Sequence, residues 1–64
     1  YVVKLRQRVT ADKVDTIKLV REITDCSLLD AKNFVEGSGE LTVTDHQKNE
    51  LVRVFLANLV VNGA

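Results

Sequence analysis

Few side chains in this 64-residue sequence could do catalytic chemistry. The only histidine, His46, follows Asp45 in the first turn of an expected amphipathic helix, where a surface imidazole is expected rather than a general base. The only cysteine, Cys26, lies in an expected turn and has no second cysteine with which to form a redox pair. One His and one Cys cannot supply a tetrahedral zinc site. We therefore expect no enzymatic activity, no cofactor and no metal site.

Two further motifs could in principle bind phosphate or nucleic acid. Gly37-Ser38-Gly39 lacks the Lys-Ser/Thr of a phosphate-binding loop and follows an expected helix rather than a strand, which indicates a turn. Lys4, Arg6 and Arg8 form a basic row, but no aromatic residue lies between them to stack on bases. A solvated sheet face explains this row as well, so we do not expect direct RNA binding.

The segment 12–24 carries two stripes at helical spacing, and each repeats at i, i+3, i+4 and i+7. The first stripe is apolar and is predicted to face the core: Thr16, Leu19, Val20 and Ile23. The second lies nearly opposite and mixes apolar with cationic residues: Val14, Ile17, Lys18 and Arg21. The second stripe is either a binding surface, a surface covered by a loop, or a pair of exposed apolar residues that need no explanation.

These helical residues belong to a pattern of strands and helices that covers the whole chain. Alternating and helical periodicities predict, in order, a strand at 1–9, helices at 12–24 and 28–36, a strand at 40–43, a helix at 45–57 and a strand at 59–62. The order βααβαβ predicts one α+β domain over residues 1–64. We expect a two-layer sandwich, a three-stranded antiparallel sheet with three helices on one face.

The helix ends and the core follow from the same pattern. Asp12, Ser27 with Asp30, and Thr44 with Gln47 are the expected N-terminal caps. The helices are expected to end at Thr24-Asp25, at a left-handed Gly37 and at a left-handed Asn58. The predicted core consists of Leu5, Leu19, Val20, Ile23, Ala31, Val35, Leu51 and Phe55.

Composition narrows the class of protein. Nine basic and nine acidic side chains cancel, so net charge does not favour an anionic partner. No apolar run approaches the length of a membrane span, so we expect no membrane contact. A single unpaired cysteine is typical of a reducing compartment, and we expect a cytoplasmic protein.

The third expected helix carries more apolar residues than one buried face requires. Its apolar residues span more than a stripe about 100° wide: Leu51, Val52, Phe55, Leu56 and Leu59. Val54 lies off that stripe as well. Either this helix is more deeply buried than the others, or it makes contacts between copies in a homo-oligomer.

The first two helices also resemble a known family. The run Lys13-Val14-x-x-Ile17-Lys18-x-Val20-Arg21-x-x-Thr24, followed by Leu28-x-x-Ala31-Lys32-x-x-Val35-Glu36, is similar to the C-terminal domain of the bacterial ribosomal stalk protein of the large subunit. The resemblance implies a binding module. In that family the domain hangs from the ribosome by an N-terminal region and a hinge, neither of which is in this sequence, and recruits translational GTPases. These are elongation factors G and Tu, initiation factor two and a release factor. The implied partner-binding residues are Val14, Ile17, Lys18, Arg21, Leu28, Asp30 and Lys32.

The turn between these helices departs from the family. Asp25-Cys26-Ser27-Leu28-Leu29-Asp30-Ala31-Lys32 stands where the family usually has Gly-Leu-Gly-Leu-Lys-Glu-Ala-Lys. Asp25 is therefore expected at positive φ, and Leu29 replaces a cation at the rim of the contact surface. Two alternatives to factor recruitment use the same fold: an adaptor of the Clp protease, whose acidic pocket has no counterpart motif here, and a scaffold that binds RNA or further copies.

Overall fold

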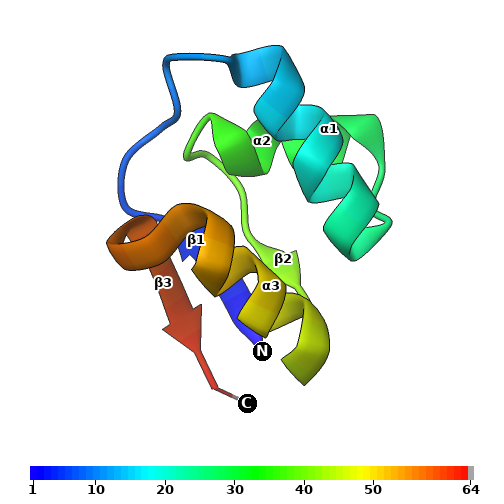
Figure 1. The fold of residues 1–64 in the computed structure, drawn as a ribbon, viewed down its shortest axis with the longest axis vertical. Helices are drawn as coiled ribbons and strands as arrows, with labels where there is room; N and C mark the ends of the chain where they lie inside the picture. Colours follow the sequence, from blue (N-terminus) through cyan, green and yellow to red (C-terminus); the bar gives the residue numbers. More distant parts are fainter. Residues whose placement is uncertain (64) are drawn as a thin grey trace.

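Three helices cover one face of a three-stranded sheet (Figure 1). The computed structural model describes residues 1–63. In chain order the elements are β1 (Val2–Leu5), α1 (Lys13–Thr24), α2 (Leu28–Val35), β2 (Leu41–Thr42), α3 (Asp45–Phe55), a short 3-10 turn (Leu56–Asn58) and β3 (Leu59–Asn62). The strand order is β2-β1-β3, and both pairings are antiparallel. The predicted α+β sandwich is confirmed.

The central strand β1 is shorter than the predicted strand 1–9. Val3 and Leu5 point into the core while Lys4 is exposed on the open face of the sheet, as the alternation predicted. After Leu5 the backbone leaves the sheet, because the Val9 N–H donates to the carbonyl of Val35, at the end of α2, at 2.9 Å. The basic residues beyond Leu5 therefore belong to a loop and not to the strand.

The start of α1 differs from the prediction. Asp12 precedes the helix in the left-handed region (φ 53°), and its side chain caps no backbone N–H. Its carbonyl instead accepts hydrogen bonds from the N–H and the hydroxyl of Thr16, both at 2.9 Å. The predicted end of α1 is confirmed: Asp25 adopts φ 56°, and its N–H donates to the Arg21 carbonyl at 2.8 Å.

The caps of α2 and the N-terminal cap of α3 agree with the sequence. The Ser27 hydroxyl accepts from the Asp30 N–H at 3.1 Å, and Gly37 takes φ 79° after the helix. Thr44 and Gln47 form both hydrogen bonds of a capping box, at 3.0 and 3.2 Å. These local hydrogen bonds fix where each helix begins without help from distant residues.

The end of α3 was predicted wrongly. The residue at positive φ is Leu56 (φ 53°, ψ −129°), and not Asn58. The Asn58 side chain is used elsewhere, because it accepts from the Gln7 N–H at 2.9 Å and donates to the Gln7 carbonyl at 3.1 Å. This pair of hydrogen bonds holds the loop after β1 against the turn before β3.

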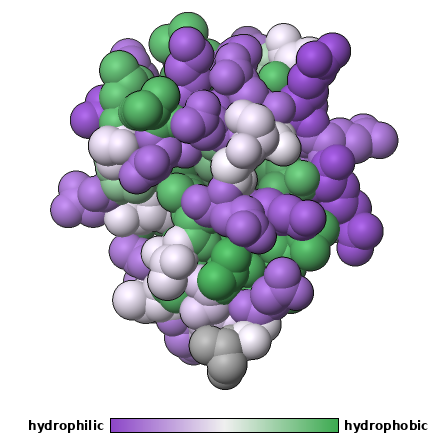
Figure 2. All heavy atoms as spheres, turned by 180° about the vertical axis from the view of Figure 1, so that it is seen from behind, coloured by the Kyte–Doolittle hydropathy of each residue, from purple (hydrophilic) through white to green (hydrophobic). Residues whose placement is uncertain are grey.

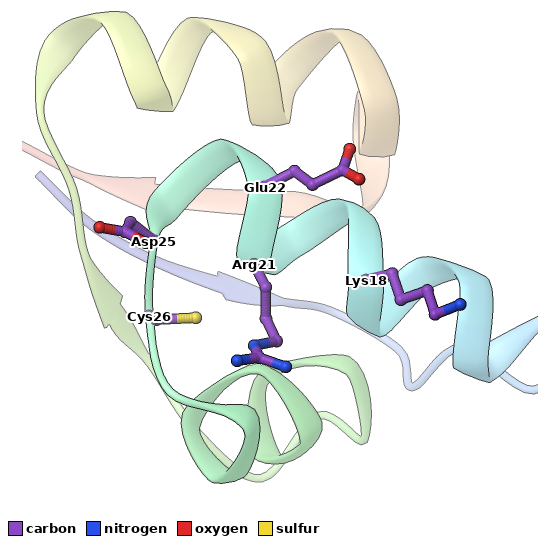
Figure 3. A pocket seen from close by; sticks show the side chains of 5 residues that line it. All are labelled: Lys18, Arg21, Glu22, Asp25 and Cys26. Carbon is purple, nitrogen blue, oxygen red and sulfur yellow. The ribbon is translucent and has the colours of Figure 1, made fainter.

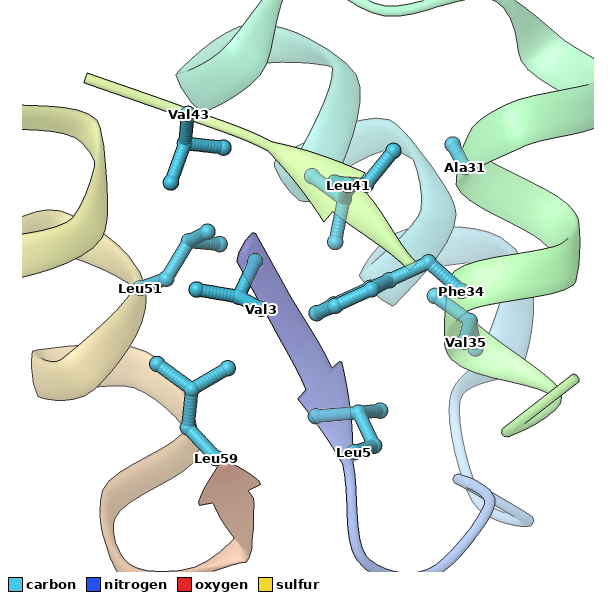
Figure 4. Close-up of a cluster of buried hydrophobic side chains, with 10 residues drawn as sticks. Val3, Leu5, Ala31, Phe34, Val35, Leu41, Val43, Leu51 and Leu59 are labelled. Atoms are coloured by element: carbon cyan, nitrogen blue, oxygen red, sulfur yellow. The ribbon is translucent and has the colours of Figure 1, made fainter. Parts of the chain in front are cut away.

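The core lies between the sheet and the helices (Figure 4) and comprises Val3, Leu5, Val20, Ala31, Phe34, Val35, Leu41, Val43, Leu51 and Leu59. Five predicted core residues are confirmed, and Ile23 and Phe55 pack against this cluster half-buried. The sequence did not single out Phe34, which is fully buried and meets Phe55 edge-to-face at 5.7 Å between ring centroids.

Leu19 is a wrong core prediction, since its side chain is 37% exposed. It lies about 100° around the helix from Val20, which is fully buried, and so falls on the flank of α1. The core-facing stripe of α1 is narrower than the apolar pattern suggested.

Truncating these two neighbours should give different losses of stability. We expect Val20→Ala to lower the free energy of unfolding by about 2 kcal/mol, because it opens a cavity in the core. Leu19→Ala should cost less than about 1 kcal/mol, because its side chain is partly solvated in the folded state. Urea denaturation of both variants measures the difference, and equal losses would contradict the assigned orientation of α1.

An ion pair between Lys13 and Glu36 joins the start of α1 to the end of α2, with Nζ 2.5 Å from Oε2. The Lys13 ammonium group, through this hydrogen bond, lowers the pKa of Glu36 below its ordinary value of 4.5. Because the folded-state pKa is the lower one, the stabilisation is complete above pH 4.5 and is lost as the pH falls through the folded pKa.

Glu36→Gln should therefore lower stability at pH 7 and have little effect at low pH, where the wild-type carboxylate is also neutral. Urea midpoints of both proteins at neutral and acid pH test this, together with an NMR titration of the Glu36 side-chain carbon. A loss of the same size at both pH values would show that charge is not the cause.

Candidate functional site

The outer surface of α1 and α2 concentrates exposed apolar side chains. The two helices pack side by side across the Asp25–Ser27 turn (Figure 1). Val14 near the start of α1 is 69% exposed, and Leu28 and Leu29 in the first turn of α2 are 57% and 65% exposed. Burying such side chains against a partner would be favourable, at roughly 25 cal/mol per Å² of apolar area.

Ile17 corrects part of the expected surface. Its side chain is half-buried and packs against the core, whereas the helical spacing had placed it with Val14 on the side away from the core. The reason is angular, because Ile17 lies about 60° around the helix from Val20 and so faces the seam beside the core. Ile17 can touch a partner with only part of its side chain.

The predicted cations of the surface form no ion pair in the described part of the chain. Lys18, Arg21 and Lys32 are exposed, and none of them makes an ion pair within residues 1–63. Lys13, on the same helix, is by contrast paired with Glu36. The predicted acidic residue Asp30 is exposed, and its backbone N–H is held by Ser27. The surface thus combines exposed apolar groups with unpaired positive charge.

Two of these residues border an open depression of about 440 Å³ at the end of α1, which is lined by Lys18, Arg21, Glu22, Asp25 and Cys26 (Figure 3). The Arg21 side chain extends toward α2, whereas Glu22 points away from it (Figure 3). The left-handed backbone at Asp25 turns the chain sharply enough to bring Cys26 beside Arg21.

The sequence did not mark Glu22, Asp25 and Cys26 as site residues. Glu22 could have been noticed because it follows Arg21 on the same helix. Asp25 could have been noticed because it stands at a turn position where the family usually has glycine. The depression is wide, open and polar, and it resembles a surface for a protein side chain more than a site for a small molecule.

Other kinds of site find little support in the described part of the chain. Residues 1–63 contain no cluster of three or more His, Cys, Asp or Glu side chains able to hold a metal ion. Among the same residues, no helix combines the length and apolarity of a membrane span.

The basic row at the N-terminus is dispersed by the fold. Lys4 lies on the sheet, but Arg6 and Arg8 lie in the following loop. The Arg6 Nε donates to the Ala57 carbonyl at 3.0 Å, and Arg8 lies against the backbone at Gly37. At least Arg6 thus serves to hold the fold together.

Comparison with known proteins identifies the family. The profile described as "Ribosomal protein L7/L12 C-terminal domain" matches residues 1–64. The chain is 42% identical over 52 residues to large ribosomal subunit protein bL12 of Mycoplasma capricolum, and 36% identical over 52 residues to that of Mesoplasma florum. Each alignment covers 81% of this chain and 43% of the relative, so the chain spans less than half the length of the curated relatives it matches. No solved structure matches at comparable significance. The family profile, the two alignments and the βααβαβ fold agree, and the chain belongs to the ribosomal protein L7/L12 C-terminal domain family.

Proposed function

We propose that this chain is the factor-binding module of a stalk protein of the large ribosomal subunit. In this role it recruits translational GTPases, among them elongation factors G and Tu and initiation factor two, through α1 and α2. It acts without catalysis, in the cytoplasm. Attachment to the ribosome depends on a region outside this sequence. The family assignment supports the ribosomal part of the proposal.

The observation that carries the proposal is the unpaired charge around exposed apolar groups on α1 and α2. Val14, Leu28 and Leu29 offer apolar contact area, and Lys18, Arg21 and Lys32 add positive charge on the same two helices. Complementary charge raises the rate of association more than it raises affinity. A partner surface that carries both acidic and apolar groups fits these two helices.

The size of the surface indicates brief binding. Two short helices, of 12 and 8 residues, present a contact area at the lower end of specific interfaces, below about 1,200 Å² in total. Transient complexes fall in this range. Fast and weak binding suits a stalk that must release each factor before the next arrives.

Reversing a site cation should slow association with little effect on folding. We expect Lys18→Glu and Arg21→Glu each to reduce the association rate constant for elongation factor G about tenfold at low salt, because both cations are exposed and form no ion pair among residues 1–63. The difference from wild type should shrink as salt shortens the Debye length to about 8 Å. Stopped-flow binding at several salt concentrations measures both effects.

Lys4→Glu is the matched control, since it makes the same charge change on the open face of the sheet. It should alter the rate far less, and circular dichroism should show all three variants folded. A wild-type chain that does not bind at low salt, or a folded Lys18→Glu variant that binds at the wild-type rate, would contradict the proposal.

The apolar contribution is best tested at Val14. Its exposed side chain makes Val14→Ala a change that should leave the melting temperature nearly unchanged and weaken binding by about 1 kcal/mol. Ile17→Ala should weaken both binding and folding, because Ile17 also packs on the core. Calorimetric titration of elongation factor G with thermal melts of each variant separates the two effects. Unchanged affinity of Val14→Ala would exclude Val14 from the interface.

A further inference from the structure

The outer edge of the sheet at β3 has free backbone groups at alternate residues. The Arg6 N–H donates to the Asn58 carbonyl at 2.8 Å. From this pair onward, hydrogen-bonded and non-hydrogen-bonded residue pairs alternate along β1 and β3. Val60 and Asn62 therefore exchange hydrogen bonds with β1, and Val61 directs its N–H and carbonyl away from the sheet. The carbonyl of Leu59 and the N–H of Gly63 point the same way. The Leu59 N–H is already bonded to Leu56.

This edge lacks the protection that sheet edges usually have. Lysines, inward-pointing charges, prolines or bulges normally prevent an edge strand from pairing with another chain. From residue 54 to residue 64 the sequence contains no charged residue and no proline. The strand Leu59–Asn62 is regular through its whole register with β1. Nothing on this strand therefore opposes pairing with a second strand.

Exposed apolar residues of α3 flank the same edge. Lys48, Val52 and Leu56 follow one another at four-residue spacing, so they share one side of the helix. The Lys48 ammonium group lies 4.7 Å from the Tyr1 ring centroid, and the Tyr1 ring borders Gly63 at the end of β3. This side of α3 thus faces β3. Val52 is 40% exposed and Leu56 is 70% exposed, although neither is needed for the core.

The backbone at Leu56 is strained. Its φ of 53° and ψ of −129° are favoured by glycine and disfavoured by a branched side chain. A leucine at this position costs stability and yet leaves most of its side chain in solvent. A contact outside the single chain would account for both facts.

We propose that the β3 edge, with Val52 and Leu56, binds the same edge of a second copy of this chain. The two β3 strands pair antiparallel about a two-fold axis between the Val61 residues. Each Val61 N–H donates to the Val61 carbonyl of the other copy, and each Gly63 N–H donates to the other copy's Leu59 carbonyl. The sheet then continues through both copies, and the two α3 helices bring Leu56 and Val52 together on the same face.

The pairing is self-complementary because the edge is uncharged and its donors and acceptors are symmetric about Val61. Figure 2 shows hydrophobic residues among hydrophilic ones on the face of the molecule seen from behind. Since β3 lies at the opposite end of the fold from the paired helices α1 and α2 (Figure 1), a dimer leaves the factor-binding surface free. The two proposals can therefore fail separately.

Sedimentation velocity of the 64-residue chain, from micromolar to millimolar concentration, tests the dimer. We expect reversible dimerisation, with amide exchange of Val61 and Gly63 slowing as concentration rises. Val61→Pro should raise the dissociation constant about tenfold or more, because it removes an outward N–H from each copy and leaves the β1 pairing intact. Val61→Thr is the matched control, since it keeps the N–H and the shape, and it should dimerise like wild type.

Leu56→Gly supplies an effect that a purely structural role would not produce. It should raise the melting temperature by relieving the positive φ, and at the same time weaken dimerisation by removing apolar contact. Val61→Lys, which places a charge at the edge without changing the backbone, is the second disruptive variant if Val61→Pro does not fold. A wild-type chain that stays monomeric at millimolar concentration would overturn the proposal. So would folded Val61→Pro or Val61→Lys dimerising as well as Val61→Thr.

Discussion

The whole fold depends on the burial of one face of β1. This strand lies at the centre of the sheet and pairs with β2 through its odd-numbered residues and with β3 through its even-numbered ones. Val3 and Leu5, both buried, form the floor on which the helices pack. A chain of this length buries only about 60% of the surface that its unfolded form exposes, so its core contains few residues. Phe34 is the largest fully buried side chain, and it reaches from α2 to Phe55 on α3.

The small core determines how much of each helix is left for binding. Val20 is the only fully buried residue of α1, and the half-buried Ile17 and Ile23 mark the two borders of its core-facing side. The opposite side of α1 is exposed, including Lys18 and Arg21, which the family resemblance named. A deeper core would have drawn more of α1 inward. Because the core is small, Val52 and Leu56 of α3 are also exposed. A domain of 64 residues can therefore present two separate surfaces, one on α1 and α2 and the other at β3 and α3.

The parts of the fold that the sequence predicted are those that local chemistry decides. The Ser27 cap, the Thr44–Gln47 box and the positive φ at Gly37 each depend on residues within a few positions of one another. The errors arise where a distant contact wins over a local preference. Asn58 was predicted as the left-handed residue, but its amide is bound by Gln7 fifty-one positions away. The strand predicted at 1–9 stops at Leu5, because Val9 pairs with Val35. For the candidate site, the family pattern supplied the expected contact residues, and their role in binding stays a prediction. The half-burial of Ile17 and the absence of ion pairs at Lys18 and Arg21 among residues 1–63 depend on the packing and could not be predicted from the sequence.

Within residues 1–63, three non-glycine residues adopt positive φ, and they differ in what the strained backbone does. Asp12 and Asp25 bracket α1, and an aspartate tolerates this conformation better than most residues. The strain at Asp25 is compensated by its N–H bond to Arg21, and it produces the sharp turn that sets α2 beside α1. Leu56 also bonds through its N–H, to the Val52 carbonyl, but its branched side chain gains little from a single chain. Strain at Asp25 therefore builds the fold, whereas strain at Leu56 holds an apolar side chain at the open edge of the sheet. Contacts that a single copy does not contain are therefore expected at the β3 edge, and not at the turn between the first two helices.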